Sequence, residues 1–246
     1  MNSIYAIIPA RGGSKGVPGK NIKMLSGHPL IAYSITSAKM SRMIDRVVVS
    51  TDSGEIADIS KYYGAEVPFL RPESLSLDDS KDVEFMLHAI KWFEQNEGSA
   101  PDYWAHLRPT TPLRDPLIVD EAIERAIGSS DMDCLRSAHK ASESPFKWFI
   151  MNENGNFEGV ANRFSNEELN DPRQNFPDVY IPDGYVDVLR TSYVKQSSSI
   201  HGPNMTGFVS PYCVEVDTIN DFDLLEFLIK KKGSPLLDYL TETYRV

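Results

Sequence analysis

Short apolar runs rich in β-branched residues alternate along this chain with longer segments whose apolar residues are spaced as in helices. Residues 4–8 and 46–50 are runs of the first kind, and each has the length of one strand buried on both faces. Residues 30–38 and 83–93 show the helical spacing. Such alternation is typical of βαβ units. The sequence therefore predicts an α/β protein with a Rossmann-like, mostly parallel sheet sandwiched by helices.

Further elements continue this order. Strands are predicted over residues 66–70, 103–107, 133–138, 185–189 and 209–216, and helices over residues 54–63, 116–127 and 222–231. The expected helix caps are Thr51, Asp52 or Ser53 for the helix over residues 54–63, Asp79, Ser80 or Asp82 for the next, and Asn220 or Asp221 for the last. Between about residues 142 and 207 the alternation stops, and only a hairpin over residues 148–160 stands out. We interpret residues 1–246 as a single domain with residues 142–207 inserted as a dimerisation or acceptor-site arm.

A cationic loop, residues 9–21, follows the first predicted strand. It contains four glycines and three cations, Arg11, Lys15 and Lys20. Glycine lets backbone N–H groups converge on an anion, and the cations add charge-assisted donors. The loop matches neither the P-loop nor the G-x-G-x-x-G pattern. We interpret it as a cradle for a nucleoside triphosphate, with a solvated surface turn as the alternative.

Two further polar segments follow predicted strands. Asp52 comes directly after residues 46–50, and Arg108 to Thr110 come after residues 103–107. In parallel sheets, ligands bind outside the carboxyl ends of the strands. These segments and the cationic loop are therefore expected to line one crevice.

Composition narrows the class of protein. The 246 residues are 41% hydrophobic and 24% charged, as in ordinary globular proteins, and the formal net charge is -10. An acidic chain argues against nucleic acid as a partner. Apolar runs stay short of a membrane span, and the N-terminal stretch has neither the length nor the charge of a signal peptide. We expect a cytoplasmic protein without a membrane partner.

Several motifs, in order, resemble the acylneuraminate cytidylyltransferase family, which makes CMP-activated sialic and related nonulosonic acids. The resemblance covers nearly the whole chain. It rests on Pro9-Ala10-Arg11-x-x-Ser14-Lys15-Gly16-x-Pro18-x-Lys20-Asn21, Ser50-Thr51-Asp52, Arg71-Pro72-Glu73, Leu107-x-Pro109-Thr110-x-Pro112-Leu113-Arg114, Pro172-Arg173-Gln174, Asp183-Gly184 and Glu215-x-Asp217-Thr218.

The resemblance implies a glycosyltransferase-A-like nucleotidyltransferase fold and a reaction. The anomeric hydroxyl of a sugar acid attacks the α-phosphate of CTP, giving a CMP-sugar and pyrophosphate. The expected catalytic residues are Arg11, Lys15 and Asp217. The expected nucleotide-binding residues are Ala10, Arg11, Gly12, Gly13, Ser14, Lys15, Lys20, Asn21, Asp52, Arg71 and Ser80. The resemblance also implies a homodimer in which the arm reaches the neighbouring site.

Glu215 and Asp217 stand two residues apart at the end of the last predicted strand, and in extended backbone side chains at this spacing point to one face. Two carboxylates beside a triphosphate suit Mg²⁺, which prefers oxygen ligands. The family's usual pair is two aspartates, whereas this chain has Glu215 first. We expect both residues to be metal ligands, with Asp217 the principal one; the alternative is that one of them only caps the next helix.

The expected acceptor-binding residues are Arg108, Thr110, Lys147, Arg173, Gln174 and Asp187. Arg108 and Asp187 depart from the family pattern, which often has glutamine and tyrosine there. An added cation suits an acceptor with a second acidic group. The alternatives are a nucleotidyltransferase of the same fold that uses another nucleoside triphosphate or a phosphorylated or phosphonate acceptor, and a non-catalytic nucleotide-sugar binding protein.

Overall fold

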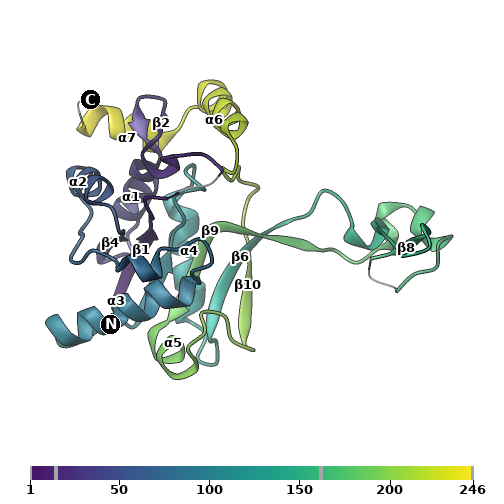
Figure 1. Ribbon diagram of the computed structural model, residues 1–246, viewed down its shortest axis with the longest axis horizontal. Coiled ribbons are helices and arrows are strands. Elements are labelled where there is room, and N and C mark those ends of the chain that lie inside the picture. Colours follow the sequence, from purple (N-terminus) through teal and green to yellow (C-terminus); the bar gives the residue numbers. More distant parts are fainter. Residues whose placement is uncertain (1, 14–15, 161–162, 245–246) are drawn as a thin grey trace.

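A mixed sheet forms the centre of the molecule. The computed structural model describes residues 2–13, 16–160 and 163–244. Within these residues the main sheet has six strands in the order β10-β6-β9-β5-β1-β4 (Figure 1). The strands are β1 (Ile4–Pro9), β4 (Arg46–Ser50), β5 (Tyr103–His106), β6 (Cys134–Lys140), β9 (Tyr180–Arg190) and β10 (Met205–Val209). Strand β1 is parallel to β4 and β5, β10 is parallel to β6, and β9 is antiparallel to both of its neighbours.

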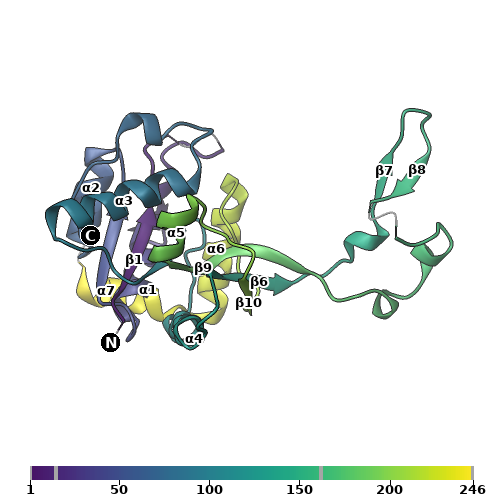
Figure 2. The same ribbon diagram turned by 90° about the horizontal axis from the view of Figure 1, so that it is seen from below.

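Helices cover both faces of this sheet (Figure 2). One face carries α1 (Leu30–Met40), α2 (Gly54–Tyr62), α4 (Pro116–Ile127), α6 (Ile219–Lys232) and α7 (Pro235–Thr243), and the other carries α3 (Asp82–Asn96) and α5 (Thr191–Ser197). Two small hairpins pair β2 (Met24–Leu25) with β3 (His28–Pro29) and β7 (Phe149–Met151) with β8 (Phe157–Gly159). This is the predicted α/β sandwich.

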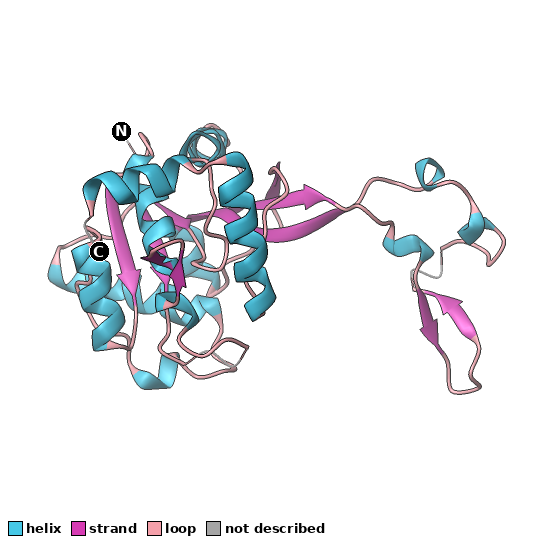
Figure 3. Cartoon of the chain, turned by 90° about the horizontal axis from the view of Figure 1, so that it is seen from above, coloured by secondary structure: helices cyan, strands magenta, loops and turns pink. Residues whose placement is uncertain are grey.

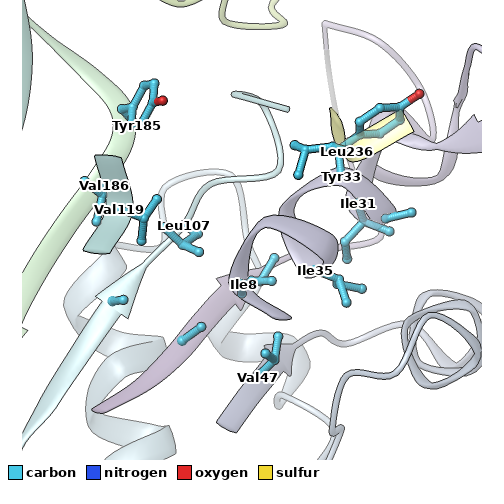
Figure 4. Packing of buried hydrophobic residues seen from close by; sticks show 14 of the residues in the cluster. Ile8, Ile31, Tyr33, Ile35, Val47, Leu107, Val119, Tyr185, Val186 and Leu236 are labelled. Atoms are coloured by element: carbon cyan, nitrogen blue, oxygen red, sulfur yellow. The ribbon is translucent and has the colours of Figure 1, made fainter. Parts of the chain in front are cut away.

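Alternation along β1 explains the two-layer core. Ile4, Ala6 and Ile8 join the cluster under α1, whereas Ile7 packs on the α3 side. Because both faces of a parallel strand are covered, its sequence is continuously apolar. Figure 4 shows Ile8 beside Ile35 of α1, with Val47 of the neighbouring strand completing the layer. The layers hold the carboxyl ends of β1, β4 and β5 level with one another.

Several predicted elements are confirmed, among them the strand over residues 46–50 and the helix over residues 116–127. Two predicted strands are wrong. Residues 66–70 make only isolated bridges, and the last strand ends at Val209 rather than running on to residue 216. Pro68 and Pro211 interrupt these segments, and proline has no N–H to donate to a ladder.

The expected caps of two helices also differ from those observed. Lys81 is the N-cap residue of α3, and Thr218 is the N-cap residue of α6. The expected Asp221 instead lies at the third helical position, where its carboxylate accepts from the Thr218 backbone N–H at 2.7 Å. This reciprocal arrangement is a capping box. The sequence placed the start of each helix within about three residues but named the wrong cap.

The chain between β6 and β9 stands away from the body. Figures 1 and 3 show β6 and β9 leading out to a projecting arm that carries β7 and β8. Trp148, Ile150 and Phe157 on this arm are 50%, 53% and 60% exposed. Later residues of the expected insertion, those of α5 and β10, lie on the body. Within the described residues, no helix has the length and apolarity needed to cross a bilayer.

Candidate active site

A cleft of about 400 Å³ lies at the carboxyl ends of β1 and β5. Its walls come from the cationic loop, from residues 75–82 before α3, from residues 108–110 and from Glu215. The crevice expected from the strand order therefore exists. The residues from the predicted site that line it are Arg11, Lys20, Asn21, Arg71, Ser80, Arg108, Thr110 and Glu215.

The cationic loop is held by its own backbone and by neighbouring carboxylates. The Gly12 N–H donates to Asp52 Oδ1 at 2.8 Å, and the Asn21 amide donates to the Arg11 carbonyl at 3.0 Å. A Cβ atom at Gly16 would lie 2.7 Å from the Asp217 carbonyl oxygen, so only glycine permits this approach. The loop is thereby brought against the acidic segment at residues 215–217. The predicted Ser14 and Lys15 lie outside the described residues.

Two cations of the loop already have partners. Arg11 donates to the Leu77 carbonyl at 2.8 Å and forms an ion pair with Asp78 at 3.0 Å. Lys20 Nζ donates to the Val216 carbonyl at 2.7 Å. These contacts orient both side chains along the cleft. An anionic ligand there would compete with Asp78 for Arg11.

Arg71 forms part of the floor of the cleft. It is 6% exposed and donates to the Ser50 hydroxyl at 3.1 Å and to the Ser50 carbonyl at 2.5 Å. Its guanidinium lies 4.9 Å from the centre of the Phe85 ring. Burial lowers the pKa of Arg71 to about 10, against the opposing influence of Asp52 and Asp82. The side chain is therefore charged at neutral pH and held rigidly under the cleft.

The opposite wall combines a cation and a carboxylate. Arg108 forms an ion pair with Asp82 at 2.8 Å. The Thr110 hydroxyl donates to Glu215 Oε1 at 3.1 Å, and the Val216 N–H donates to the Thr110 carbonyl at 2.8 Å. Residues 108–110 and 215–216 are therefore bonded to each other. Residues 215–217 also touch the cationic loop, since Lys20 Nζ donates to the Val216 carbonyl.

Of the acidic pair, Glu215 lines the cleft and Asp217 does not. Glu215 and Asp217 are exposed while Val214 and Val216 are buried, so the two carboxylates lie on the same side although the segment is not a β-strand. Among the described residues, no group of three or more His, Cys, Asp or Glu side chains could enclose a metal. Mg²⁺ usually takes one or two carboxylates together with water and substrate phosphates. Two carboxylates next to the cationic loop are consistent with that donor set.

Other residues of the predicted site lie outside the cleft. Lys147, Arg173 and Gln174 belong to the arm; Lys147 donates to the Asp171 carbonyl at 2.7 Å, and Arg173 to the Ala141 carbonyl at 2.5 Å. Asp187 is 3% exposed and lies between two imidazoles, 3.8 Å from His106 Nδ1 and 3.7 Å from His201 Nε2. Ala10 is buried under the loop, and Gly13 is exposed. The structure thus brings several of the predicted nucleotide-binding residues together in the cleft and places the predicted residues of the arm apart from them.

Asp78 and Asp82 were not predicted from the sequence as residues of the site. Both carboxylates come from residues 75–82, and each pairs with a cation of the cleft. A signal was present, because acidic and hydroxyl residues crowd the segment just before a predicted helix. Only the fold shows that this segment turns back over Arg11 and Arg108.

Comparison with known proteins agrees with this geometry. A family model described as cytidylyltransferase matches residues 5–144. The CMP-N,N'-diacetyllegionaminic acid synthase of Campylobacter jejuni is 32% identical over 97% of this chain and 100% of its own length. The pseudaminic acid cytidylyltransferase of the same organism is 31% identical over 91% of this chain and 95% of its own.

The fold is shared with solved structures. One is a CMP:2-keto-3-deoxy-manno-octonic acid synthetase complexed with CTP, with a TM-score of 0.70 and 15% identity over 94% of this chain and 99% of that one. At that identity the likeness concerns the fold alone. The sequence matches carry the assignment: this chain belongs to the cytidylyltransferase family and is a nucleotidyltransferase.

Proposed function

We propose that this enzyme transfers the cytidylyl group of CTP to a nonulosonic, sialic-like sugar acid. The anomeric hydroxyl oxygen forms a bond to the α-phosphorus, and the bond from that phosphorus to the bridging oxygen of the β-phosphate breaks. Pyrophosphate leaves with the bonding electrons, and the hydroxyl proton passes to solvent. Such a transfer depends mainly on positioning and on neutralising charge.

One observation carries the proposal. A single cleft has the cations of the loop on one wall and residues 108–110 on the other, with Glu215 between them. Arg11, Lys15 and Lys20 would hold the triphosphate, with donors from the backbone of residues 10–14. Arg71, Asn21, Asp52 and Ser80 would position the nucleoside directly or through the loop. We assign the catalytic roles to Lys15, Arg11 and Asp217.

Magnesium is the cofactor that the donor set favours. Asp217 and Glu215 would hold it together with the triphosphate, and the ion would supply neutralisation of phosphate charge. Glu215 already accepts from Thr110 at 3.1 Å, so its carboxylate is oriented before any ion binds. Asp217 is the freer of the two to bind directly, since its described bond is from its backbone N–H to Asp221 at 2.9 Å.

Arg108 and Thr110 line the cleft and would recognise the sugar acid from within one chain. Asp187, which was expected to share this role, is 3% exposed and lies outside the cleft, so it would not contact the acceptor. Lys147, Arg173 and Gln174 lie on the arm, away from the cleft of their own chain. We therefore propose a homodimer in which each arm brings these residues to the neighbouring site. Exposed apolar side chains on the arm support this, because contiguous exposed apolar surface commonly marks an interface. We also propose a cytoplasmic location for the enzyme.

The test is pyrophosphate release with CTP, UTP or GTP against a panel of nonulosonic acids. We expect CTP with one of these acids to give the highest kcat/KM. Best activity with plain N-acetylneuraminate would contradict a specialised role for Arg108. Preference for a phosphonate or phosphorylated acceptor, or CTP binding without turnover on any acceptor, would replace the proposed substrate class.

A further inference from the structure

A buried cation and a buried anion flank one backbone segment, Asp183 to Tyr185. Arg114 is 2% exposed and Asp183 is 8% exposed. Neither side chain lines the cleft. Arg114 binds the segment that contains Arg108, and Asp183 binds the segment that begins at Ser210. Both can therefore influence the geometry of the cleft without lining it.

Arg114 fastens three segments together. Its Nε donates to the Tyr185 carbonyl at 2.5 Å, and its Nη2 donates to the carbonyls of Gly184 and Arg108, each at 2.5 Å. Its Nη1 donates to the Ser34 hydroxyl of α1 at 2.8 Å. Burial lowers the pKa of Arg114 to about 10, so it remains a cation at neutral pH. The rigid fork of a guanidinium suits such multiple acceptors, and a lysine ammonium does not.

Asp183 is the complementary anion. Its Oδ1 accepts from the Ser137 hydroxyl at 2.6 Å and from the Tyr185 N–H at 3.1 Å. Its Oδ2 accepts from His139 Nδ1 at 3.1 Å and from the Ser210 hydroxyl at 2.6 Å. Both oxygens therefore face donors. Ser210 begins the extended segment that carries Glu215 and Asp217.

Gly184, between the two charges, permits a close approach. A Cβ atom there would lie 2.7 Å from the Thr111 hydroxyl and 3.1 Å from Arg108 Cδ. Real Cβ atoms do not tolerate a contact of 2.7 Å, so a side chain would push β9 away from residues 108–111. The Asp183 to Tyr185 backbone consequently lies directly behind Arg108.

These contacts form a closed ring. Segment 210–216 is anchored at its start by Ser210 to Asp183 and at its end by Val216 to Thr110. The two anchors are joined through the backbone of Gly184 and through Arg114, which holds the Arg108 carbonyl. We propose that Arg114 and Asp183 are positioning residues that fix the acidic segment, residues 210–217, against residues 108–110 on the acceptor side of the site. The catalytic meaning of that arrangement rests on the proposed function.

Substitution of Asp183 by Asn removes the negative charge and keeps the size and shape of the side chain. The Tyr185 N–H can only donate, so the amide oxygen must stay at the Oδ1 position. The NH₂ group then faces Ser210 and His139, which lose their charge-assisted acceptor. Asp183→Asn should therefore loosen the Ser210 anchor while leaving the volume unchanged. Ser210→Ala removes that anchor alone, and Arg114→Lys loosens the Arg108 side.

Asp120 provides a matched control. It is a buried carboxylate, 7% exposed, that accepts from the Ser41 hydroxyl and from the Arg42 N–H, and it lies outside the cleft. Asp120→Asn should lower the free energy of unfolding much as Asp183→Asn does, since each loses hydrogen bonds to a buried carboxylate. It should leave the acidic segment unaffected.

The experiment combines amide hydrogen exchange with steady-state kinetics on the full chain. We expect Asp183→Asn and Ser210→Ala to accelerate exchange in peptides covering residues 210–218, and Asp120→Asn to leave them as in wild type. The half-saturating Mg²⁺ concentration should rise about three- to ten-fold in the first two variants, a loss of ~0.6–1.4 kcal/mol in metal binding. Arg114→Lys should chiefly raise KM for the sugar acid.

The outcomes distinguish failure of the positioning role from failure of the proposed function. Exchange of residues 210–218 that stays at wild-type rates in both Asp183→Asn and Ser210→Ala would overturn the positioning role, whatever the activity. Faster exchange with an unchanged Mg²⁺ requirement would also overturn it, since the ring would then not govern the site. A wild-type enzyme that makes no CMP-sugar would refute the proposed function alone, because hydrogen exchange needs no turnover.

Discussion

Arg11 and Asp78 form an ion pair of 3.0 Å at the cleft, where a triphosphate would need the same guanidinium. Arg11 also donates to the Leu77 carbonyl, so residues 77–78 hold the loop cation in place. Arg108 is paired with Asp82 from the same segment. One stretch of chain thus supplies the counter-ions for both walls of the site.

Removing the charge of Asp78 should tighten nucleotide binding. The side chains of Arg11 and Asp78 are 31% and 47% exposed, so their pair is partly screened by water. Because exposed pairs are worth ~0.2–1 kcal/mol, Asp78→Asn should lower the Kd for CTP by at most about five-fold. Isothermal titration calorimetry checks this, with Glu121→Gln on the outer face of α4 as control. A weaker Kd would show that Asp78 itself helps to bind the nucleotide.

Asp217→Asn should abolish Mg²⁺-dependent turnover. The amide keeps the size of the side chain but loses the charge that a hard cation requires. Glu215→Gln should retain some turnover with a higher Mg²⁺ requirement, because a water molecule can bridge at that position. The measurement is initial rate against Mg²⁺ concentration, and Asp223→Asn on exposed α6 serves as control. Unchanged turnover in Asp217→Asn would remove Asp217 from the metal site.

A charge on the arm hairpin should dissociate the proposed dimer. The rings of Phe149 and Phe157 pack at a tilt, with their centroids 5.5 Å apart, and the residues are 49% and 60% exposed, so a partner surface would bury both. Phe157→Glu would place a carboxylate in that interface, at a cost of several kcal/mol if unpaired. Light scattering after gel filtration should then report a monomer, whereas Asn154→Asp at the hairpin tip stays dimeric. A wild-type monomer at micromolar concentration would reject the dimer.

His106 should make stability depend on pH. Burial lowers the pKa of this imidazole to about 4, Arg108 and Arg114 also lower it, and Asp82 and Asp187 oppose the shift. The unfolded chain protonates it near pH 6.5, so between about pH 6.5 and about 4 the unfolded state binds more protons. The free energy of unfolding should fall through this window as pH falls, by up to about 1.4 kcal/mol per pH unit.

Urea denaturation at several pH values measures this dependence. His106→Gln cannot be protonated, so its free energy of unfolding should vary less steeply than that of wild type between about pH 6.5 and about 4. An equal slope in the two proteins would mean that other groups carry the pH dependence.

Much of the fold could be predicted from the sequence because the spacing of apolar residues shows which strands and helices have buried faces. The apolar run of β4 and the apolar spacing along α4 require only that some neighbour covers the buried face, whichever neighbour it is. The antiparallel insertion of β9 between β5 and β6 could not be predicted, since nothing within residues 180–190 specifies which strands it will join. Helix α7 also went unpredicted.

The cationic loop and the acidic pair could be read from the sequence because their chemistry is local: glycines and cations crowd one turn, and two carboxylates stand two residues apart. Which groups face them was decided by tertiary structure. Asp78 meets Arg11 across 66 intervening positions, Thr110 meets Glu215, and Asp183 reaches Ser210. Such pairings arise from chain segments that the packed sheet and helices bring together, and a single sequence carries no local signal for them.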